Sequence, residues 1–219
     1  MMFGQPEFVY NPEPRCPVVL LLDNSTSMSG APIEELNKGL FKFKEEVERD
    51  TLASQRVELS IVSFGPVEHV QDFVTINSYV PKALEPKGST PMGAAIEYGL
   101  DLIRDRKEMY RNNGIQHFTP WMILITDGAP TDSWENASER VMRAEANKEL
   151  TFFSVGVCNA NMDTLKRMSL RPPAMLNGLN FEKFFKWVSD PLKQVSCSRP
   201  NSNEMLKLDP IDAWGTIGV

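Results

Sequence analysis

Short apolar runs alternate along the chain with longer stretches in which apolar residues recur at helical spacing. Residues 17–22 form a continuous apolar run with β-branched side chains, the pattern of a parallel strand buried on both faces. The run ends at Asp23. Residues 33–47 then carry apolar side chains at near-helical spacing, and Pro32 suits the first helical turn. This part of the chain therefore predicts a strand, a loop and a helix.

The rest of the chain repeats this alternation. The β-rich segments 57–64 and 67–76 flank Gly65-Pro66, which predicts a hairpin and an antiparallel strand at one edge of a sheet. A closing helix is expected from Phe181, and Pro191 should kink or end it. No clear period is present in residues 199–219. The remaining pattern predicts helices at about 91–107, 134–148 and 163–168, and strands at 121–126, 151–157 and 174–179.

This order of elements predicts the fold class: an α/β, doubly wound, Rossmann-like sheet, mostly parallel with one antiparallel edge strand and with helices on both faces. We expect a single domain over residues 15–198, an N-terminal extension over 1–14, and a tail over 199–219 that packs on or extends the domain. Ligands of such sheets bind at the carboxyl ends of strands where the winding reverses. Asp23 and Asp127 both follow predicted strands.

Length and cysteine content limit the class of protein. At 219 residues and 42% hydrophobic residues, the chain suits one globular domain that needs no disulfide or structural metal. Cys16, Cys158 and Cys197 are far apart and lack CxxC spacing, which argues against a disulfide framework and a zinc site. The N-terminus shows no signal-peptide pattern, and no apolar run approaches the roughly 20 residues of a membrane span. We expect a soluble, cytoplasmic protein.

The charge balance disfavours nucleic acid as a partner. A net charge of -6 and a pI of about 5.1 leave no basic excess to attract a phosphate backbone. The basic residues Arg104, Arg106 and Lys107 are interpreted as a solvated helix face. His69 and His117 have no Cys or carboxylate at ligand spacing and are interpreted as ordinary surface or hydrogen-bonded histidines. We therefore expect no catalytic residues.

The loop after the first predicted strand carries candidate chemistry. Asp23-x-Ser25-x-Ser27 places a carboxylate and two hydroxyls on alternate positions, so the three oxygens can face one side of an extended backbone. Ligand sets made only of oxygen suit Mg²⁺, Mn²⁺ or Ca²⁺ rather than zinc or copper. We expect Mg²⁺ in cytosol, with Mn²⁺ or Ca²⁺ as alternatives. Alone the pattern is weak, because Ser and Asp after a strand also form turns and helix caps.

Two further segments add to this loop. Thr90, in Gly88-Ser89-Thr90-Pro91, opens a predicted helix, and Asp127 lies in Thr126-Asp127-Gly128 after another apolar strand. Each has a simpler interpretation, since Thr90 could cap the helix and Asp127-Gly128 could form a turn. Asp132 is interpreted as the cap of the helix near Trp134 and not as a ligand. Each of the three segments lies at the end of a predicted strand or at the start of a predicted helix. This arrangement favours one shared site.

Together these segments resemble the metal-ion-dependent adhesion site of von Willebrand factor A domains, over about residues 15–196. In that family, hydroxyls at the positions of Ser25, Ser27 and Thr90 bind the metal, and carboxylates at the positions of Asp23 and Asp127 hold it directly or through water. The resemblance implies a non-enzymatic domain that binds a carboxylate of a partner protein through the metal. A vertex of the metal's octahedral shell can stay open for that carboxylate.

The sequence is also similar to the TerY family of bacterial, tellurium-resistance-associated A-domain proteins. Ala129 departs from the Glu expected there, and Pro191 interrupts the last helix. The similarity implies a bacterial stress-response or defence setting, with a PP2C-type phosphatase or a protein kinase as candidate partners. The segments that carry it are Leu20-Leu21-Leu22-Asp23, Gly30-Ala31-Pro32-Ile33-Glu34, Thr126-Asp127-Gly128-Ala129-Pro130-Thr131-Asp132 and Phe184-Phe185-Lys186-Trp187.

Two functions of other classes stay open as alternatives. A magnesium-dependent phosphatase or phosphotransferase could use Asp23 as its nucleophile, since such folds also place a carboxylate at a strand end. Ser25 stands where a haloacid-dehalogenase-type loop has a second Asp, and Lys87 is the only obvious cation nearby. A nucleotide-binding Rossmann protein is the other alternative. Neither GxGxxG nor GxxxxGK[ST] follows the first strand, which argues against it.

Overall fold

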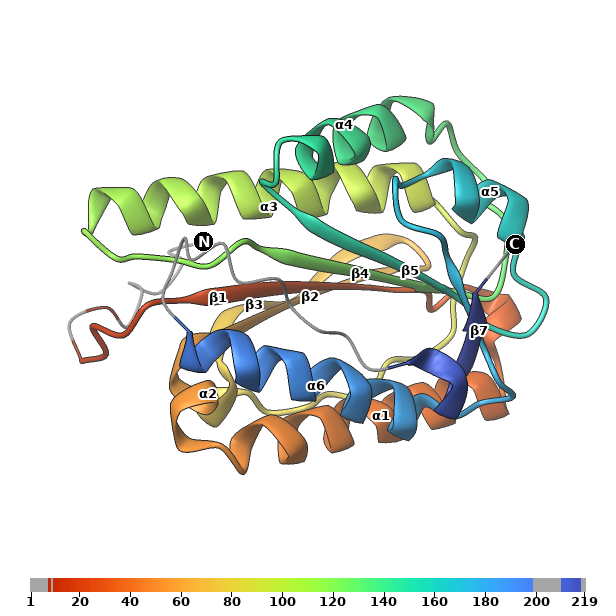
Figure 1. Cartoon of the computed structure of the whole chain (residues 1–219). Coiled ribbons are helices and arrows are strands. Elements are labelled where there is room, and N and C mark those ends of the chain that lie inside the picture. Colours follow the sequence, from red (N-terminus) through yellow and green to blue (C-terminus); the bar gives the residue numbers. More distant parts are fainter. Residues whose placement is uncertain (1–7, 9, 199–209, 218–219) are drawn as a thin grey trace.

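The computed structural model describes residue 8 and residues 10–198 and 210–217. A seven-stranded sheet runs through the centre of the molecule, in the order β3-β2-β1-β4-β5-β6-β7 (Figure 1). Its strands are β1 (Cys16–Leu22), β2 (Val57–Phe64), β3 (Val67–Thr75), β4 (Trp121–Thr126), β5 (Thr151–Gly156), β6 (Ala174–Leu176) and β7 (Gly215–Ile217).

Strand pairing confirms the predicted fold class. β1 pairs in parallel with both β2 and β4, and the parallel pairing continues through β5 to β6. β3 is antiparallel to β2, as the Gly65-Pro66 turn predicts. β7 adds a second antiparallel strand against β6, which the aperiodic sequence of that region did not indicate. Because the chain leaves β1 toward β2 and later returns to β4 on the other side, the winding reverses between β1 and β4.

Helices cover both faces of the sheet. α1 (Ala31–Glu48), α2 (Thr51–Arg56) and α6 (Phe181–Cys197) lie on one face. α3 (Met92–Asn112), α4 (Glu135–Ala146) and α5 (Met162–Arg167) lie on the other. Short 3-10 turns occur at Thr26–Met28, Ile76–Ser78 and Ile211–Ala213. No helix within the described ranges is long and apolar enough to cross a membrane.

The protein has two hydrophobic cores, one on each face of the sheet. They explain why the central strands carry apolar side chains at every position and not at alternate ones. Leu20 and Leu22 of β1 join the core under α1 and α6, whereas Val19 and Leu21 join the core under α3 and α4. All four side chains are fully buried. A strand with a helical layer on each face must present apolar side chains to both, so the continuous run is required by the layered architecture.

Three helices differ from the sequence prediction. α2 was not predicted, and α3 continues to Asn112 instead of ending near residue 107. Of the two outcomes predicted at Pro191, a kink or an end of the helix, the end is wrong, because α6 continues through Pro191 to Cys197. Its buried apolar stripe packs against α1, where a Cβ on Gly39 would lie 2.7 Å from the Phe185 ring. Burial of this stripe offsets the backbone hydrogen bond that Pro191 cannot donate.

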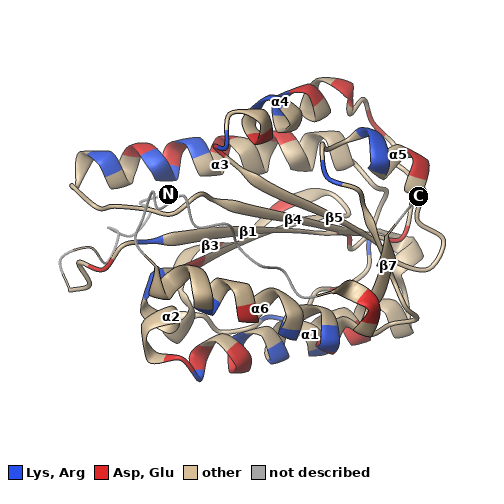
Figure 2. Ribbon diagram, viewed as in Figure 1, with Lys and Arg blue, Asp and Glu red and all other residues tan. Residues whose placement is uncertain are grey.

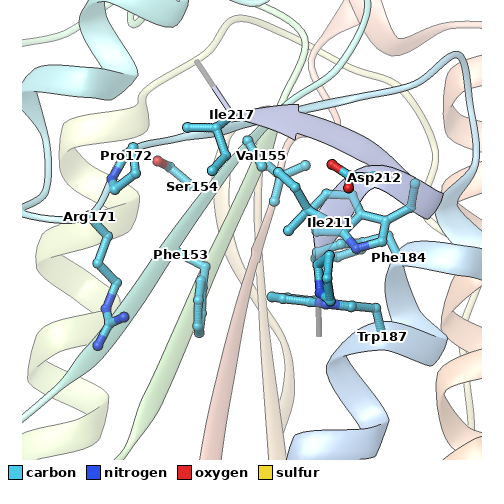
Figure 3. Close-up of a pocket in the computed structure, with 13 residues that line it drawn as sticks. Phe153, Ser154, Val155, Arg171, Pro172, Phe184, Trp187, Ile211, Asp212 and Ile217 are labelled. Carbon is cyan, nitrogen blue, oxygen red and sulfur yellow. The ribbon is translucent and has the colours of Figure 1, made fainter. Parts of the chain in front are cut away.

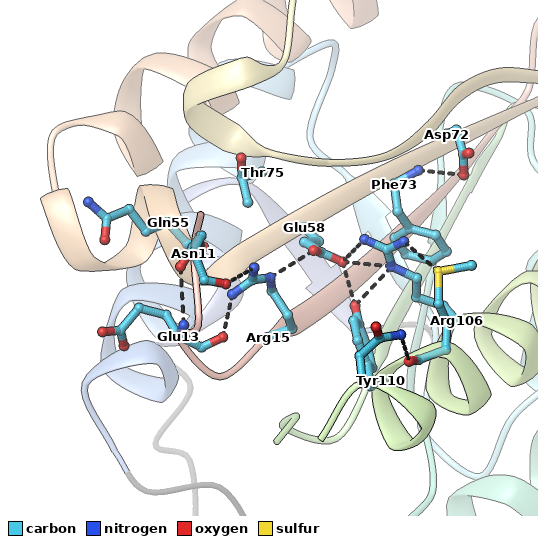
Figure 4. A network of polar contacts seen from close by, with 12 residues as sticks. Asn11, Glu13, Arg15, Gln55, Glu58, Asp72, Phe73, Thr75, Arg106 and Tyr110 are labelled. Atoms are coloured by element: carbon cyan, nitrogen blue, oxygen red, sulfur yellow. Dashed lines mark hydrogen bonds and ion pairs between the residues drawn. The ribbon is translucent and has the colours of Figure 1, made fainter. Parts of the chain in front are cut away.

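A buried polar network ties the N-terminal segment to the sheet and to α3 (Figure 4). The carboxylate of Glu58 on β2 accepts hydrogen bonds from Arg15 Nε at 2.8 Å and from the Tyr110 hydroxyl at 2.5 Å. Nε and Nη2 of Arg106 lie 2.9 and 2.7 Å from the same carboxylate. The two guanidinium groups lie 5.6 and 5.1 Å from the centroid of the Phe8 ring.

Arg106 therefore differs from its sequence interpretation as part of a solvated helix face. Its side chain is buried, because Glu58 on the neighbouring element compensates its charge. Arg104 and Lys107 stay accessible on α3. Helical spacing alone could not separate Arg106 from its neighbours, since the compensating carboxylate lies on β2.

Candidate metal centre

The candidate site lies where the winding reverses. Asp23 follows β1 directly, and Asp127 follows β4, its neighbour in the sheet. The Asp23 amide donates to the carbonyl of Ile125 at 2.9 Å, which continues the β1–β4 pairing to the edge of the sheet. The two carboxylates, separated along the sequence, thus meet at the carboxyl ends of adjacent parallel strands.

Hydrogen bonds connect four of the five predicted ligands. Ser27 Oγ donates to Asp127 Oδ1 at 2.7 Å, and the hydroxyl oxygens of Ser25 and Ser27 lie 2.9 Å apart. The Ser25 amide donates to Asp23 Oδ1 at 2.8 Å. Thr126 Oγ1 donates to Asp23 Oδ2 at 2.5 Å and so orients this carboxylate from β4. Sequence reasoning did not identify Thr126 as a partner of Asp23.

Thr90 comes from a third segment and stands beside the Asp127 loop. A Cβ built on Gly128 would lie 3.7 Å from Thr90 Oγ1. The Thr90 amide donates to Thr131 Oγ1 at 3.1 Å, and the Thr131 amide donates to the Thr90 carbonyl at 2.9 Å. Thr90 is buried, and its hydroxyl has no hydrogen-bond partner in the part of the chain that the structure describes. An oxygen ligand is thus available at the fifth predicted position.

Helix capping in this region differs from the prediction. Asp132 caps α3, not the helix near Trp134, since its two oxygens accept from the amides of Gly93 at 3.0 Å and Ala94 at 2.8 Å. The alternative that Thr90 caps α3 was also wrong, because Pro91 is the N-cap and no cap bond from Thr90 is formed. The cap comes from a residue remote in sequence, which leaves the Thr90 hydroxyl available.

Gly88 binds the Asp23–Ser27 loop through hydrogen bonds to Thr26. Its carbonyl accepts from the amide of Thr26 at 3.1 Å and from the Thr26 hydroxyl at 2.9 Å. Gly88 has a φ of +68°, and a Cβ there would lie 2.3 Å from the carbonyl oxygen of Gly65. Only glycine fits both the dihedral angle and this close approach.

The electrostatics of the site favour a cation. Asp23 is fully buried and Asp127 nearly so. Burial raises the pKa of Asp23, hydrogen bonds from Ser25 and Thr126 lower it, and the Asp127 charge raises it, with a net upward shift. Lys87 pairs with Glu68 at 2.6 Å, and neither Asp23 nor Asp127 has an ion-pair partner among the described residues. Two adjacent carboxylates without a counter-charge are costly to keep ionised.

The five side chains predicted as ligands would suit a hard divalent ion. They provide two carboxylates and three hydroxyls, the oxygen set that suits Mg²⁺, Mn²⁺ or Ca²⁺. Within the described ranges, no group of three or more His, Cys, Asp or Glu side chains is placed to hold a metal, so a zinc-type cluster is not found there. Ser27 is exposed whereas Asp23 and Ser25 are buried, so the site opens to the surface on the Ser27 side.

A cavity of about 360 Å³ lies apart from these residues, against β5 and α6 (Figure 3). Phe153, Phe184, Trp187 and Ile211 contribute apolar side chains to its wall. The C-terminal segment contributes Trp214 to this lining, and Trp214 is buried and packs against the rings of Phe184 and Trp187. The segment that forms β7 thereby extends the core over the end of α6.

Comparisons with known proteins agree with this architecture. The model of the von Willebrand factor type A domain family matches residues 18–190. Collagen alpha-5(VI) chain of Mus musculus is 23% identical over 211 residues, a match that takes in 92% of this chain and 8% of the collagen chain. The chain therefore spans less than a tenth of this curated relative.

Two solved structures share the fold. The vWF domain of the type V pili tip protein Mfa5 from Porphyromonas gingivalis has a TM-score of 0.60 at 11% identity, covering 87% of this chain and 99% of that one. Proximal thread matrix protein 1 from the mussel byssus has a TM-score of 0.56 at 16% identity, covering 82% of this chain and 48% of that one. The family model matches most of the chain, on the same strands and helices that build the site, and the chain belongs to the von Willebrand factor type A domain family.

Proposed function

We propose that this domain binds a divalent metal, Mg²⁺ in the first place, and uses it to bind a carboxylate of a partner protein. Domains of this family generally mediate protein–protein interaction and adhesion. The observation that carries the proposal is the convergence of three chain segments at the β1–β4 switch point. There, Asp23 and Asp127 meet the hydroxyls of Ser25, Ser27 and Thr90, without a protein cation beside them in the described chain.

Each side chain has a distinct part in this proposal. Asp23 and Asp127 balance the metal charge, and the hydroxyls of Ser25, Ser27 and Thr90 add neutral ligands that leave the ion electrophilic. When bound, the metal supplies the positive charge that attracts an Asp or Glu of the partner. The neighbouring bonds from Thr126 and the Ser25 amide hold the Asp23 carboxylate in a fixed orientation.

The proposed setting is a bacterial, cytoplasmic stress-response or defence system, with a PP2C-type phosphatase or a protein kinase among the partners. It rests on the sequence similarity to TerY proteins. Cys16, Cys158 and Cys197 are free thiols in the structure, which supports a reducing compartment.

We propose a binding function rather than catalysis. In a phosphatase, Asp23 would have to reach its substrate, whereas this side chain is fully buried and both its oxygens accept hydrogen bonds. Lys87, the cation that a phosphate would need, pairs with Glu68. Release of phosphate from a generic phosphoester by the wild type, lost in Asp23→Asn, would reinstate the enzyme hypothesis.

The test is metal-dependent capture of partners from lysate of the native host. Wild type in Mg²⁺ is compared with wild type in EDTA and with Ser25→Ala/Ser27→Ala in Mg²⁺. Ser29→Ala is a matched control in the same loop, because its hydroxyl bonds only the Thr26 carbonyl among the described residues. We expect the same partners to be lost in EDTA and in the double variant but retained by the control. Partners that persist under all conditions, with the double variant folded, would refute the proposal.

A further inference from the structure

A basic groove of about 370 Å³ lies between α3 and α4, away from the candidate metal centre. Its wall includes His117, shortly before β4, and Leu150, directly before β5. It therefore lies toward the amino ends of these strands, whereas Asp23 and Asp127 lie at the carboxyl ends. Leu100 and Ile103 of α3, together with Leu150, provide buried apolar side chains to its lining.

Helical spacing gathers cations on both walls of this groove. α3 contributes Arg104, Lys107 and Arg111, spaced so that they share one helix face, and α4 contributes Arg140 and Arg143. Figure 2 shows the basic positions on these two helices. Among the described residues, Glu149 is the only acidic one that lines the groove. Such a concentration of positive charge is unexpected on a chain with a net charge of -6.

Two of these five cations form ion pairs. Arg104 pairs with Asp101 and Asp105, and Arg140 pairs with Glu97 and Asp101. By contrast, no ion pair involving Lys107, Arg111 or Arg143 occurs within the described part of the chain.

The helix dipoles account for only part of this pattern. Arg111 and Arg143 lie in the last turns of α3 and α4, where a cation is favourable by itself. That effect does not explain why both face a common groove with Lys107 and an apolar lining.

His117 adds a hydrogen-bonding group to the same wall. Its Nδ1 is 2.9 Å from the Phe118 carbonyl, an arrangement in which Nδ1 donates and Nε2 can accept or, on protonation, donate. Lys107, Arg111 and His117 line the same groove. Burial lowers the pKa of His117, the hydrogen bond with Phe118 raises it, and the charges of Lys107 and Arg111 lower it, with a net downward shift. An anion bound in the groove would reduce the electrostatic repulsion among the cations that line it.

We propose that the groove binds a small organic phosphate of about nucleotide size. Lys107, Arg111 and Arg143 would bind the phosphate, and the apolar body of the ligand would lie on Leu100, Ile103 and Leu150. The groove volume falls at the lower end of the range for small-molecule sites, about 300–1,000 Å³. A nucleic acid fits less well, since its backbone needs an extended basic face and this chain is acidic overall.

The test uses isothermal titration calorimetry with AMP and ADP as probes, at low ionic strength and with EDTA present. EDTA keeps Mg²⁺ from bridging phosphate to the candidate metal centre. Adenosine tests the need for the phosphate, and inorganic phosphate tests the need for an apolar body. We expect AMP and ADP to bind with a Kd that rises with salt, inorganic phosphate to bind more weakly, and adenosine not to bind.

The variant Arg111→Gln/Arg143→Gln removes two solvent-exposed charges that form no ion pair with the described residues. Its Kd for ADP should rise by roughly tenfold or more per guanidinium, because charge-assisted hydrogen bonds to phosphate are among the strongest in proteins. Lys183→Gln, on α6 at the opposite face of the sheet, is the control and should leave the Kd unchanged.

Absence of binding by AMP and ADP at millimolar concentration would overturn the proposal, as would equal affinity of the double variant and the wild type. Inorganic phosphate binding as tightly as ADP would overturn the part assigned to the apolar lining. Partner capture through the metal centre would be unaffected by any of these results.

Discussion

Replacing Glu58 with Gln tests whether the buried network of Figure 4 stabilises the fold. The substitution keeps the shape of the side chain and removes its charge. Arg15 and Arg106, with 0% and 8% exposure, would then share no carboxylate. The Tyr110 hydroxyl would still find an acceptor in the amide oxygen.

The expected loss is large. Breaking a buried ion pair by removal of one partner costs about 3–5 kcal/mol, because the remaining charge is buried and uncompensated. That is a substantial part of the roughly 5–15 kcal/mol that stabilises a typical domain. For a chain of this size, a loss of about 1 kcal/mol lowers Tm by roughly 2–4 °C, so we expect Tm to fall by about 6–20 °C.

Urea unfolding followed by tryptophan fluorescence and calorimetric Tm would measure the change. Glu35→Gln is the matched control, since Glu35 pairs with Lys38 at 2.6 Å on the exposed face of α1. An exposed pair of this kind contributes at most about 1 kcal/mol. A Glu58→Gln protein as stable as the control would refute the argument that Glu58 compensates two buried cations.

The other predictions concern the candidate metal centre and the C-terminal segment. The raised pKa of Asp23 means that its contribution to the stability of the metal-free protein is present below the unfolded pKa of about 4 and is lost as pH rises through the folded pKa. In EDTA at pH 7, Asp23→Asn should therefore be more stable than wild type in urea unfolding, with a smaller advantage near pH 4. Mg²⁺ should no longer raise the Tm of this variant. Equal urea unfolding curves of variant and wild type at both pH values would contradict this prediction. Thr90→Ala should weaken Mg²⁺ binding by about tenfold in calorimetric titration. The free energy of unfolding of the metal-free protein should stay within about 1 kcal/mol of wild type, because the Thr90 hydroxyl has no partner among the described residues. An unchanged Kd for Mg²⁺ would remove Thr90 from the proposed ligands. Trp214→Ala should cost about 3–5 kcal/mol in urea unfolding, since Trp214 is buried against Phe184 and Trp187, and a change below about 1 kcal/mol would show that the C-terminal segment adds little to the core.

The sequence by itself determined the layered fold and the position of the candidate site. A strand with helices on both faces needs apolar side chains at every position, so residues 17–22 and 121–126 could be recognised as central strands. Their carboxyl ends place Asp23 and Asp127 at the same edge of the sheet. These conclusions depend on which residues are buried and on the direction of each strand. Both can be inferred from short stretches of the sequence.

Tertiary structure decided which partner each polar side chain has. Nothing near Asp132 in sequence shows that it caps α3, and nothing near Arg106 shows that Glu58 compensates its charge. β7 is a further example, because a three-residue strand has too few positions to show a period and forms only where β6 offers an open edge.

The basic groove is also formed only by tertiary packing. Lys107 and Arg111 are ordinary surface cations on α3 until packing brings α4 and Arg143 opposite them. Hydrophobic periodicity records which side chains leave water. Contacts between segments that are distant in sequence arise only when the elements pack, and these contacts create both the hydrogen bonds around Asp23 and the charge of the groove.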